Sequence, residues 1–219
     1  MTPSDLVAIP GGEFLRGQND GRDDERPAHY VTVSPFRMAR CQVTNADYAA
    51  MRKGEFADPT LPVTSVSWFD AALYCQWLAG QWNLPVRLPT EAEWEFAARG
   101  GLEQYRYPWG DSLPDLEPGR WRDGPEPVGM GKPNGYGLFD MCQNVHEWCS
   151  DWYDPSYYAQ SPALNPQGPA DGVRRSSKGG AWRHHIKFAR CAARSSIPPE
   201  FRYADYGFRI VVGQMPNTR

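Results

Sequence analysis

The sequence lacks several features that would assign it to a simple class of protein. No basic segment followed by an apolar run lies near Met1, so we expect neither a secretory signal nor a membrane span, and the default compartment is the cytoplasm. The five cysteines are an odd number without regular spacing, which is typical of reduced thiols rather than of a disulfide framework. The formal net charge of -3 gives no reason to expect a nucleic-acid partner.

The chain also lacks a low-complexity linker, and 219 residues at 41% hydrophobic content can bury a full core. We therefore expect one domain over residues 1–219. With 21 glycines, 21 prolines and 13% aromatic residues, the composition favours ordered loops and an interior filled by large rings. A glycine-flanked nucleophile elbow and a strand-to-helix phosphate loop are missing, so neither a Ser-His-Asp triad nor a nucleotide site is indicated.

Three short helices are predicted from capping chemistry, because a hydroxyl residue precedes a carboxylate by three positions in each. The expected caps are Thr44, Ser67 and Thr90. Apolar residues recur at intervals of three and four from Trp68 onward, and we expect Gly80 to end that helix. Strand signals are weaker and lie at residues 30–33 and 207–212.

Short motifs follow one another along almost the whole chain in a distinctive order. The last three read Gly179-Gly180-Ala181-Trp182, Arg190-Cys191-Ala192-Ala193-Arg194-Ser195 and Gly207-Phe208-Arg209. Earlier blocks lie at residues 9–14, 25–27, 43–45, 62–68, 87–95, 107–110, 133–138 and 144–148. This order resembles the formylglycine-generating enzyme family, also called sulfatase-modifying factors. The resemblance implies an α+β, C-type-lectin-like fold that is rich in loops, with short helices flanking small antiparallel sheets.

The catalytic members of that family have a pair of copper-binding cysteines between the Gly-Gly motif and the Arg-Cys-Ala-Ala-Arg motif. The corresponding interval of this chain, residues 183–189, contains no cysteine. Cys191 falls inside the second motif and so matches a noncatalytic cysteine of the family. Because Cu(I) is bound by soft thiolates, we expect no copper and no formylglycine-generating activity.

The resemblance further implies a structural calcium ion in segment 140–147. Carried over residue by residue, its ligands would be the side chains of Asp140 and Glu147 and the main-chain carbonyls of Gln143 and Val145. Such hard oxygen donors suit calcium. Gln143 stands where the family usually has Gly, which disfavours the turn if φ is positive there. The alternative is that Glu147 pairs with a buried arginine and no ion binds.

The C-terminal part is locally basic, with nine cations and two acids from Val173 to Arg209. Those inside the family motifs, Arg190, Arg194 and Arg209, are expected to pair with acidic residues from the N-terminal half. The loops at 183–188 and 201–206 are expected to meet as one exposed patch that binds an anionic or aromatic ligand. The residues of this ligand-binding patch are Arg183, His184, His185, Lys187, Phe201, Arg202, Tyr203 and Tyr206.

His184 and His185 could also bind a transition metal together with Cys191, since imidazole and thiolate suit copper, iron or zinc. Neighbouring residues of an extended segment point to opposite sides, however, so such histidines more often line a pocket or face solvent. Cys142 and Cys149 flank His146 in a tryptophan-rich segment, and we interpret that segment as core.

Four functions are compatible with these observations. The first is a ligand-binding or accessory module that recognises a small molecule, a peptide or a protein. The second is a metal-dependent oxidoreductase that uses another metal set or a second subunit. The third, formylglycine generation itself, is disfavoured by the missing cysteine pair. The fourth is a variable receptor of the diversity-generating retroelement type. The first is the leading hypothesis, with no nucleic-acid or membrane partner.

Overall fold

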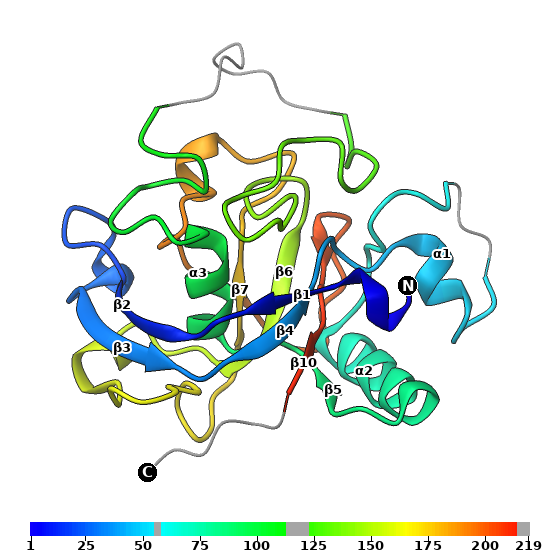
Figure 1. The fold of residues 1–219 in the computed structure, drawn as a ribbon, viewed down its shortest axis with the longest axis horizontal. Coiled ribbons are helices and arrows are strands. Elements are labelled where there is room, and N and C mark those ends of the chain that lie inside the picture. Colours follow the sequence, from blue (N-terminus) through cyan, green and yellow to red (C-terminus); the bar gives the residue numbers. More distant parts are fainter. Residues whose placement is uncertain (55–57, 113–122, 214–219) are drawn as a thin grey trace.

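The computed structural model describes residues 1–54, 58–112 and 123–213, and Figure 1 shows how they are arranged. Short strands and helices alternate with long ordered loops. The strands are β1 (Leu6–Ile9), β2 (Gly12–Arg16), β3 (His29–Val33), β4 (Phe36–Ala39), β5 (Val86–Arg87), β6 (His146–Trp152), β7 (Arg175–Lys178), β8 (Ser195–Ile197), β9 (Tyr206–Gly207) and β10 (Val211–Val212). The α-helices are α1 (Asn45–Ala49), α2 (Trp68–Trp82) and α3 (Glu91–Arg99). Single 3₁₀ turns lie at Pro3–Asp5, Asp23–Glu25, Tyr157–Gln160 and Ile186–Phe188.

The strands form small sheets. One has the order β1-β4-β10-β5, a second is the β2-β3 hairpin, and a third has the order β8-β7-β6-β9. All pairs are antiparallel except β6 with β9, which run parallel. In Figure 1, α2 lies beside β5, and α3 lies beside β2 and β7. The predicted α+β class, with short helices flanking small sheets, is confirmed.

Each predicted cap precedes an α-helix and accepts a hydrogen bond from the third helical N–H. Asp47 and Asp70 complete the same reciprocal box that Glu93 forms, so aspartate serves here as well as glutamate. The predicted stop at Gly80 was wrong, because α2 continues past it. The residue that takes the left-handed conformation and ends the helix is Asn83, with φ of 52°.

The predicted strand at 30–33 is confirmed as part of β3, whereas the one at 207–212 is divided. Its two ends belong to different sheets, as β9 and β10. Arg209 lies between them and is fully buried. Its guanidinium reaches Glu147 of β6, so the chain leaves one sheet and enters the next around a buried ion pair.

Two of the three arginines of the C-terminal motifs pair with acidic residues of the N-terminal half, as expected, whereas Arg209 pairs with Glu147 of β6, outside that half. Arg190 pairs with Glu25, and Arg194 pairs with Glu91 at the first position of α3. Burial alone would raise the pKa of Glu95, one turn further along α3, but Lys178 and Arg99 lower it to about 2. These buried pairs fix the C-terminal segment against the N-terminal half. No helix among the described residues combines the length and apolar composition that a bilayer span requires.

Candidate functional site

The two loops of the predicted patch lie against each other. Arg183 donates two hydrogen bonds to the carboxylate of Asp205, from Nε at 2.8 Å and from Nη2 at 2.6 Å. The Asp205 side chain is 1% exposed and that of Arg183 is 43% exposed. This bidentate pair therefore joins loop 183–188 to loop 201–206 with its carboxylate inside and its guanidinium at the surface.

Backbone hydrogen bonds hold both loops to the segment that leads into β6. The amide of His146 donates to the carbonyl of Asp205 at 2.8 Å, and the amide of Trp182 donates to the carbonyl of Asn144 at 2.8 Å. The parallel pairing of β6 with β9 places His146 opposite Tyr206. Three segments far apart in the sequence are thus fixed side by side by main-chain bonds.

A continuous row of ring contacts crosses the junction of the loops. Neighbouring ring centroids along it are separated by 5.8, 6.0, 4.7, 5.0 and 6.4 Å. We call this row the aromatic strip, and in order its members are Phe201, Tyr203, Tyr206, His146, His184 and Phe188. Its two ends are exposed while its centre is buried, so the rings open to solvent are those near the ends.

Most of the predicted patch is exposed or half-buried, but Tyr206 is not. Its ring stacks on His146 and packs against Trp148, and its hydroxyl lies 3.2 Å from Ser195 Oγ. The expectation that Tyr206 is exposed was wrong, because the residue belongs to β9 and not to the loop before it. Arg202 is exposed and is paired with Asp70 at 2.8 Å.

The neighbouring histidines diverge, as their adjacency predicts. His184 Nδ1 lies 3.0 Å from His146 Nε2, whereas His185 is exposed and accepts from the amide of Lys187. Cys191 is fully buried in the hydrophobic core, and burial raises the pKa of its thiol to about 12. The side chain of His184 therefore contacts His146, and not the Cys191 thiol that the sequence suggested as a shared metal ligand.

Sequence reasoning missed His146 as a site residue. It is 3% exposed, and burial, together with His184 and Arg183, lowers its pKa to about 3. Burial also lowers the pKa of His184. Both imidazoles are consequently neutral near pH 7. The segment around His146 is core, as interpreted, but β6 turns this ring toward the loops.

The segment predicted to bind calcium is a tight turn with left-handed backbone at three positions. The φ angles are 55° at Asp140, 70° at Gln143 and 60° at Asn144, so the conformation that favours Gly at position 143 is present. The carboxylate of Asp140 accepts from the amide of Gly129 at 2.7 Å. Burial raises the pKa of this carboxyl group.

Both oxygens of Glu147 already have cationic and neutral donors. Arg209 donates to Oε1 and Oε2 at 2.8 and 2.7 Å, Trp94 Nε1 donates to Oε2, and Gln42 Nε2 donates to Oε1. The same Gln42 amide also donates to the carbonyl of Asp140. This is the buried-arginine arrangement that the sequence offered as the alternative. A calcium ion at Glu147 would have to exchange for some of these donors.

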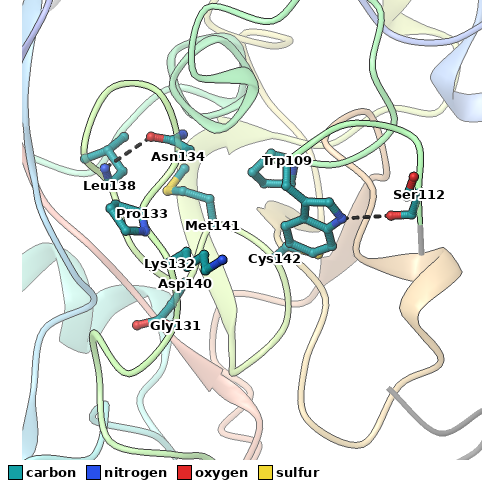
Figure 2. Close-up of a pocket in the computed structure, with 11 residues that line it drawn as sticks. Trp109, Ser112, Gly131, Lys132, Pro133, Asn134, Leu138, Asp140, Met141 and Cys142 are labelled. Carbon is teal, nitrogen blue, oxygen red and sulfur yellow. Dashed lines mark hydrogen bonds between the residues drawn. The ribbon is translucent and has the colours of Figure 1, made fainter. Parts of the chain in front are cut away.

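A cavity of about 570 Å³ opens beside this turn. Figure 2 shows Trp109 on one side of it, with Nε1 donating to the carbonyl of Ser112, and Asn134, Leu138 and Met141 on the other. Asp140 and Cys142 also line it. The sequence marked the motif around Trp109 only as a turn, because nothing local shows which distant segment faces its ring.

The side chains in and near residues 183–189 show which donor groups this region offers to a metal ion. Residues 183–189 supply imidazole, guanidinium and ammonium groups but no thiol, and Cys191 is enclosed by the core. Burial raises the pKa of the half-buried Cys142 thiol well above its usual range as well. The donors around the strip therefore do not fit a two-thiolate Cu(I) site.

Comparison with known proteins gives a consistent result. Residues 1–214 match the sequence model of the sulfatase-modifying factor enzyme 1-like domain. The formylglycine-generating enzyme of Streptomyces coelicolor is 36% identical over 93% of this chain and 87% of its own length. The serine/threonine-protein kinase pkn1 of Chlamydia caviae is 34% identical over 96% of this chain, which spans only 38% of that kinase.

Solved structures show the same fold. PvdO from Pseudomonas aeruginosa superposes with a TM-score of 0.83 and 26% identity, covering 94% of this chain and 93% of PvdO. The Treponema denticola variable protein 1 superposes with a TM-score of 0.81 and 25% identity, covering 94% of both chains. The predicted C-type-lectin-like fold of the formylglycine-generating enzymes is confirmed by these likenesses.

Proposed function

Because this chain belongs to the family of sulfatase-modifying factor enzyme 1-like domains, we propose that it is a binding or accessory module of that family. Its recognition surface is the aromatic strip with the cations beside it. The observation that carries the proposal is the Arg183–Asp205 pair, which holds two loops together so that rings from both form one row. A rigid scaffold presenting such a row needs little ordering on binding.

The chemistry of the strip favours a ligand that is both aromatic and anionic. Phe188, Phe201 and Tyr203 are each about two-fifths exposed (40%, 41% and 40%) and offer ring faces for stacking. Lys187 is exposed beside them and supplies positive charge. An aromatic carboxylate, free or at the surface of a peptide, satisfies both features. The match to 38% of a larger kinase supports the view that such a domain can act alongside others.

The test uses ¹⁵N-labelled protein titrated with 4-hydroxyphenylacetate, an aromatic carboxylate. Matched titrations use p-cresol, which lacks the charge, and acetate, which lacks the ring. We expect amide shifts confined to residues 183–188 and 201–206, weaker with p-cresol and absent with acetate. Shifts centred on the cavity beside Trp109, or no saturable shifts with the aromatic carboxylate, contradict the proposal.

A second candidate function is a metal-dependent oxidoreductase related to the formylglycine-generating enzymes. It is favoured by the approach of His146, His184 and Asp205, whose ligand atoms all lie within 4.8 Å of one another. Oxidoreductase chemistry at this position would need a metal bound by these groups instead of cysteines. The two candidates differ in whether the strip surrounds a reactive centre or only a binding surface.

Calcium at Asp140, Gln143, Val145 and Glu147 stays a proposal, supported by the tight left-handed turn and by the charge of Asp140. A variable receptor stays a minor proposal, supported by the fold shared with a protein named as variable. We also propose a cytoplasmic location, supported by five cysteines that are all free thiols. The proposed partner is a small molecule, peptide or protein at the strip, with neither nucleic acid nor membrane.

A further inference from the structure

We propose that His146, His184 and Asp205 together bind one divalent first-row transition-metal ion at the centre of the aromatic strip. Within the described residues they form a group of two imidazoles and one carboxylate whose ligand atoms lie within 4.8 Å of one another. Two imidazoles with one carboxylate are a donor set that suits ferrous iron or zinc and leaves coordination positions open. The inference is independent of the binding-module proposal.

The distance between the imidazoles fits a shared ion. Metal–nitrogen bonds of about 2.0–2.1 Å place two cis nitrogens roughly 2.9 Å apart at a right angle and roughly 3.4 Å apart at the tetrahedral angle. His146 Nε2 and His184 Nδ1 are 3.0 Å apart. Nε2 is therefore the nitrogen of the His146 ring that is directed at His184.

The backbone already holds the three ligand-bearing segments together. His146 donates its amide to the carbonyl of Asp205, and His184 lies in a turn closed by its amide bond to the carbonyl of Ala181 at 2.9 Å. The same turn is held to the segment that leads into β6, because the amide of Trp182 donates to the carbonyl of Asn144. Only side chains would need to adjust, and His184 has room to rotate because its side chain is 37% exposed.

Asp205 can serve the ion while it keeps its arginine. Its Oδ2 accepts from Arg183 Nε at 2.8 Å, and its carboxylate supplies one of the three ligand atoms that lie within 4.8 Å of one another. Each carboxylate oxygen has two lone pairs, so one can accept from the guanidinium and the other can face the metal. Arg183 then acts as the outer partner that orients a metal-binding carboxylate. The half-exposed His184 marks the side from which an ion or its exchangeable ligand enters.

The experiment titrates tag-free, chelator-treated protein with Co²⁺, and then with Zn²⁺ and anaerobic Fe²⁺ by calorimetry. We expect visible Co²⁺ ligand-field absorption that saturates at one ion per chain and is displaced by Zn²⁺. His184→Gln should weaken binding by at least the roughly 10–100-fold that loss of an outer partner costs. His185→Gln is the matched control, because that ring is exposed and its Nδ1 accepts from the amide of Lys187, and it should bind as the parent does.

Three outcomes overturn the inference: no saturable Co²⁺ absorption, unchanged affinity in His184→Gln, or an equal loss in His185→Gln, which indicates adventitious binding to the surface pair. His146→Gln is measured as well. If that substitution of a buried residue unfolds the protein, the affinity of His184→Gln for the metal still tests the site, because His184 is half-exposed. Failure of metal binding removes the oxidoreductase candidate. It does not affect the binding-module proposal, which is tested separately by the titration with 4-hydroxyphenylacetate.

Discussion

Arg209 and Glu147 form a two-pronged ion pair in the core, with Nε–Oε2 and Nη2–Oε1 distances of 2.7 and 2.8 Å. Both residues are fully buried. The pair connects β6 to the crossover between β9 and β10, so it fixes the strand that carries His146. Removal of one partner leaves an uncompensated charge in a region without solvent.

We therefore expect Glu147→Gln to lower the free energy of unfolding by about 3–5 kcal/mol. Urea unfolding followed by tryptophan fluorescence measures it. The matched control is Arg202→Gln, which breaks the exposed pair with Asp70 and should leave the unfolding midpoint unchanged. Equal midpoints for Glu147→Gln and the parent contradict the role assigned to the pair.

Calcium binding is tested best at Asp140, because substitution of Glu147 also breaks the pair with Arg209. If the ion binds, calcium at 100 times its dissociation constant stabilises the parent by about 2.7 kcal/mol. Asp140→Ala should lose that calcium response while it remains folded. Thermal melts with calcium, magnesium or chelator measure the difference. Superimposable melts of the parent under all three conditions reject calcium at residues 140–147.

Asp151 gives the fold a pH dependence. Burial and, next, the charge of Glu91 raise its pKa to about 7, from 3.8 in an exposed chain. Its Oδ1 has no hydrogen-bond partner among the described residues, while Oδ2 accepts from the amide of Glu91. The native state thus binds a proton that the unfolded state has lost between about pH 4 and 7.

Since this contribution is complete at low pH and lost as pH rises through about 7, the parent should lose stability across that window. Asp151→Asn should remove this slope, because an amide keeps the acceptor without the charge. Each pKa unit corresponds to about 1.4 kcal/mol, so the two proteins should diverge by a few kcal/mol. Unfolding at pH 4.5, 6 and 8 measures this. If the free energy of unfolding changes with pH equally in the parent and in Asp151→Asn, Asp151 is not protonated in the native state.

We expect no conversion of a Cys-x-Pro-x-Arg sulfatase peptide to formylglycine, even after copper loading. The reason is that residues 183–189 contain no thiol and Cys191 is buried. Mass spectrometry of the peptide is the measurement, with Cys191→Ser as the control. Conversion by the parent that disappears in Cys191→Ser shows that this thiol has taken over the reaction.

Local signals predicted the starts of the helices, because a cap and its carboxylate lie within four residues of each other. Local signals did not predict where α2 ends. The helix continues through Gly80 and ends at Asn83, which adopts the left-handed conformation. The motif order predicted the fold and the meeting of the two loops. It did not predict that Tyr206 is buried or that His146 joins the site, because both depend on the parallel pairing of β6 with β9. Two-residue pairings between distant segments leave no periodic pattern in a sequence.

The most direct test of the recognition surface removes one ring and one charge from the strip without disturbing the core. Lys187→Ala with Tyr203→Ala spares Arg183, whose loss would leave Asp205 buried and unpaired. Both positions are exposed, so the melting curve should stay close to that of the parent, within about 0.5 kcal/mol in stability. Tyr30→Ala with Lys53→Ala is the matched control, since these exposed residues lie outside the strip. The account predicts that the first double variant loses the 4-hydroxyphenylacetate shifts while the control keeps them. Undiminished shifts in a folded Lys187→Ala/Tyr203→Ala protein contradict it.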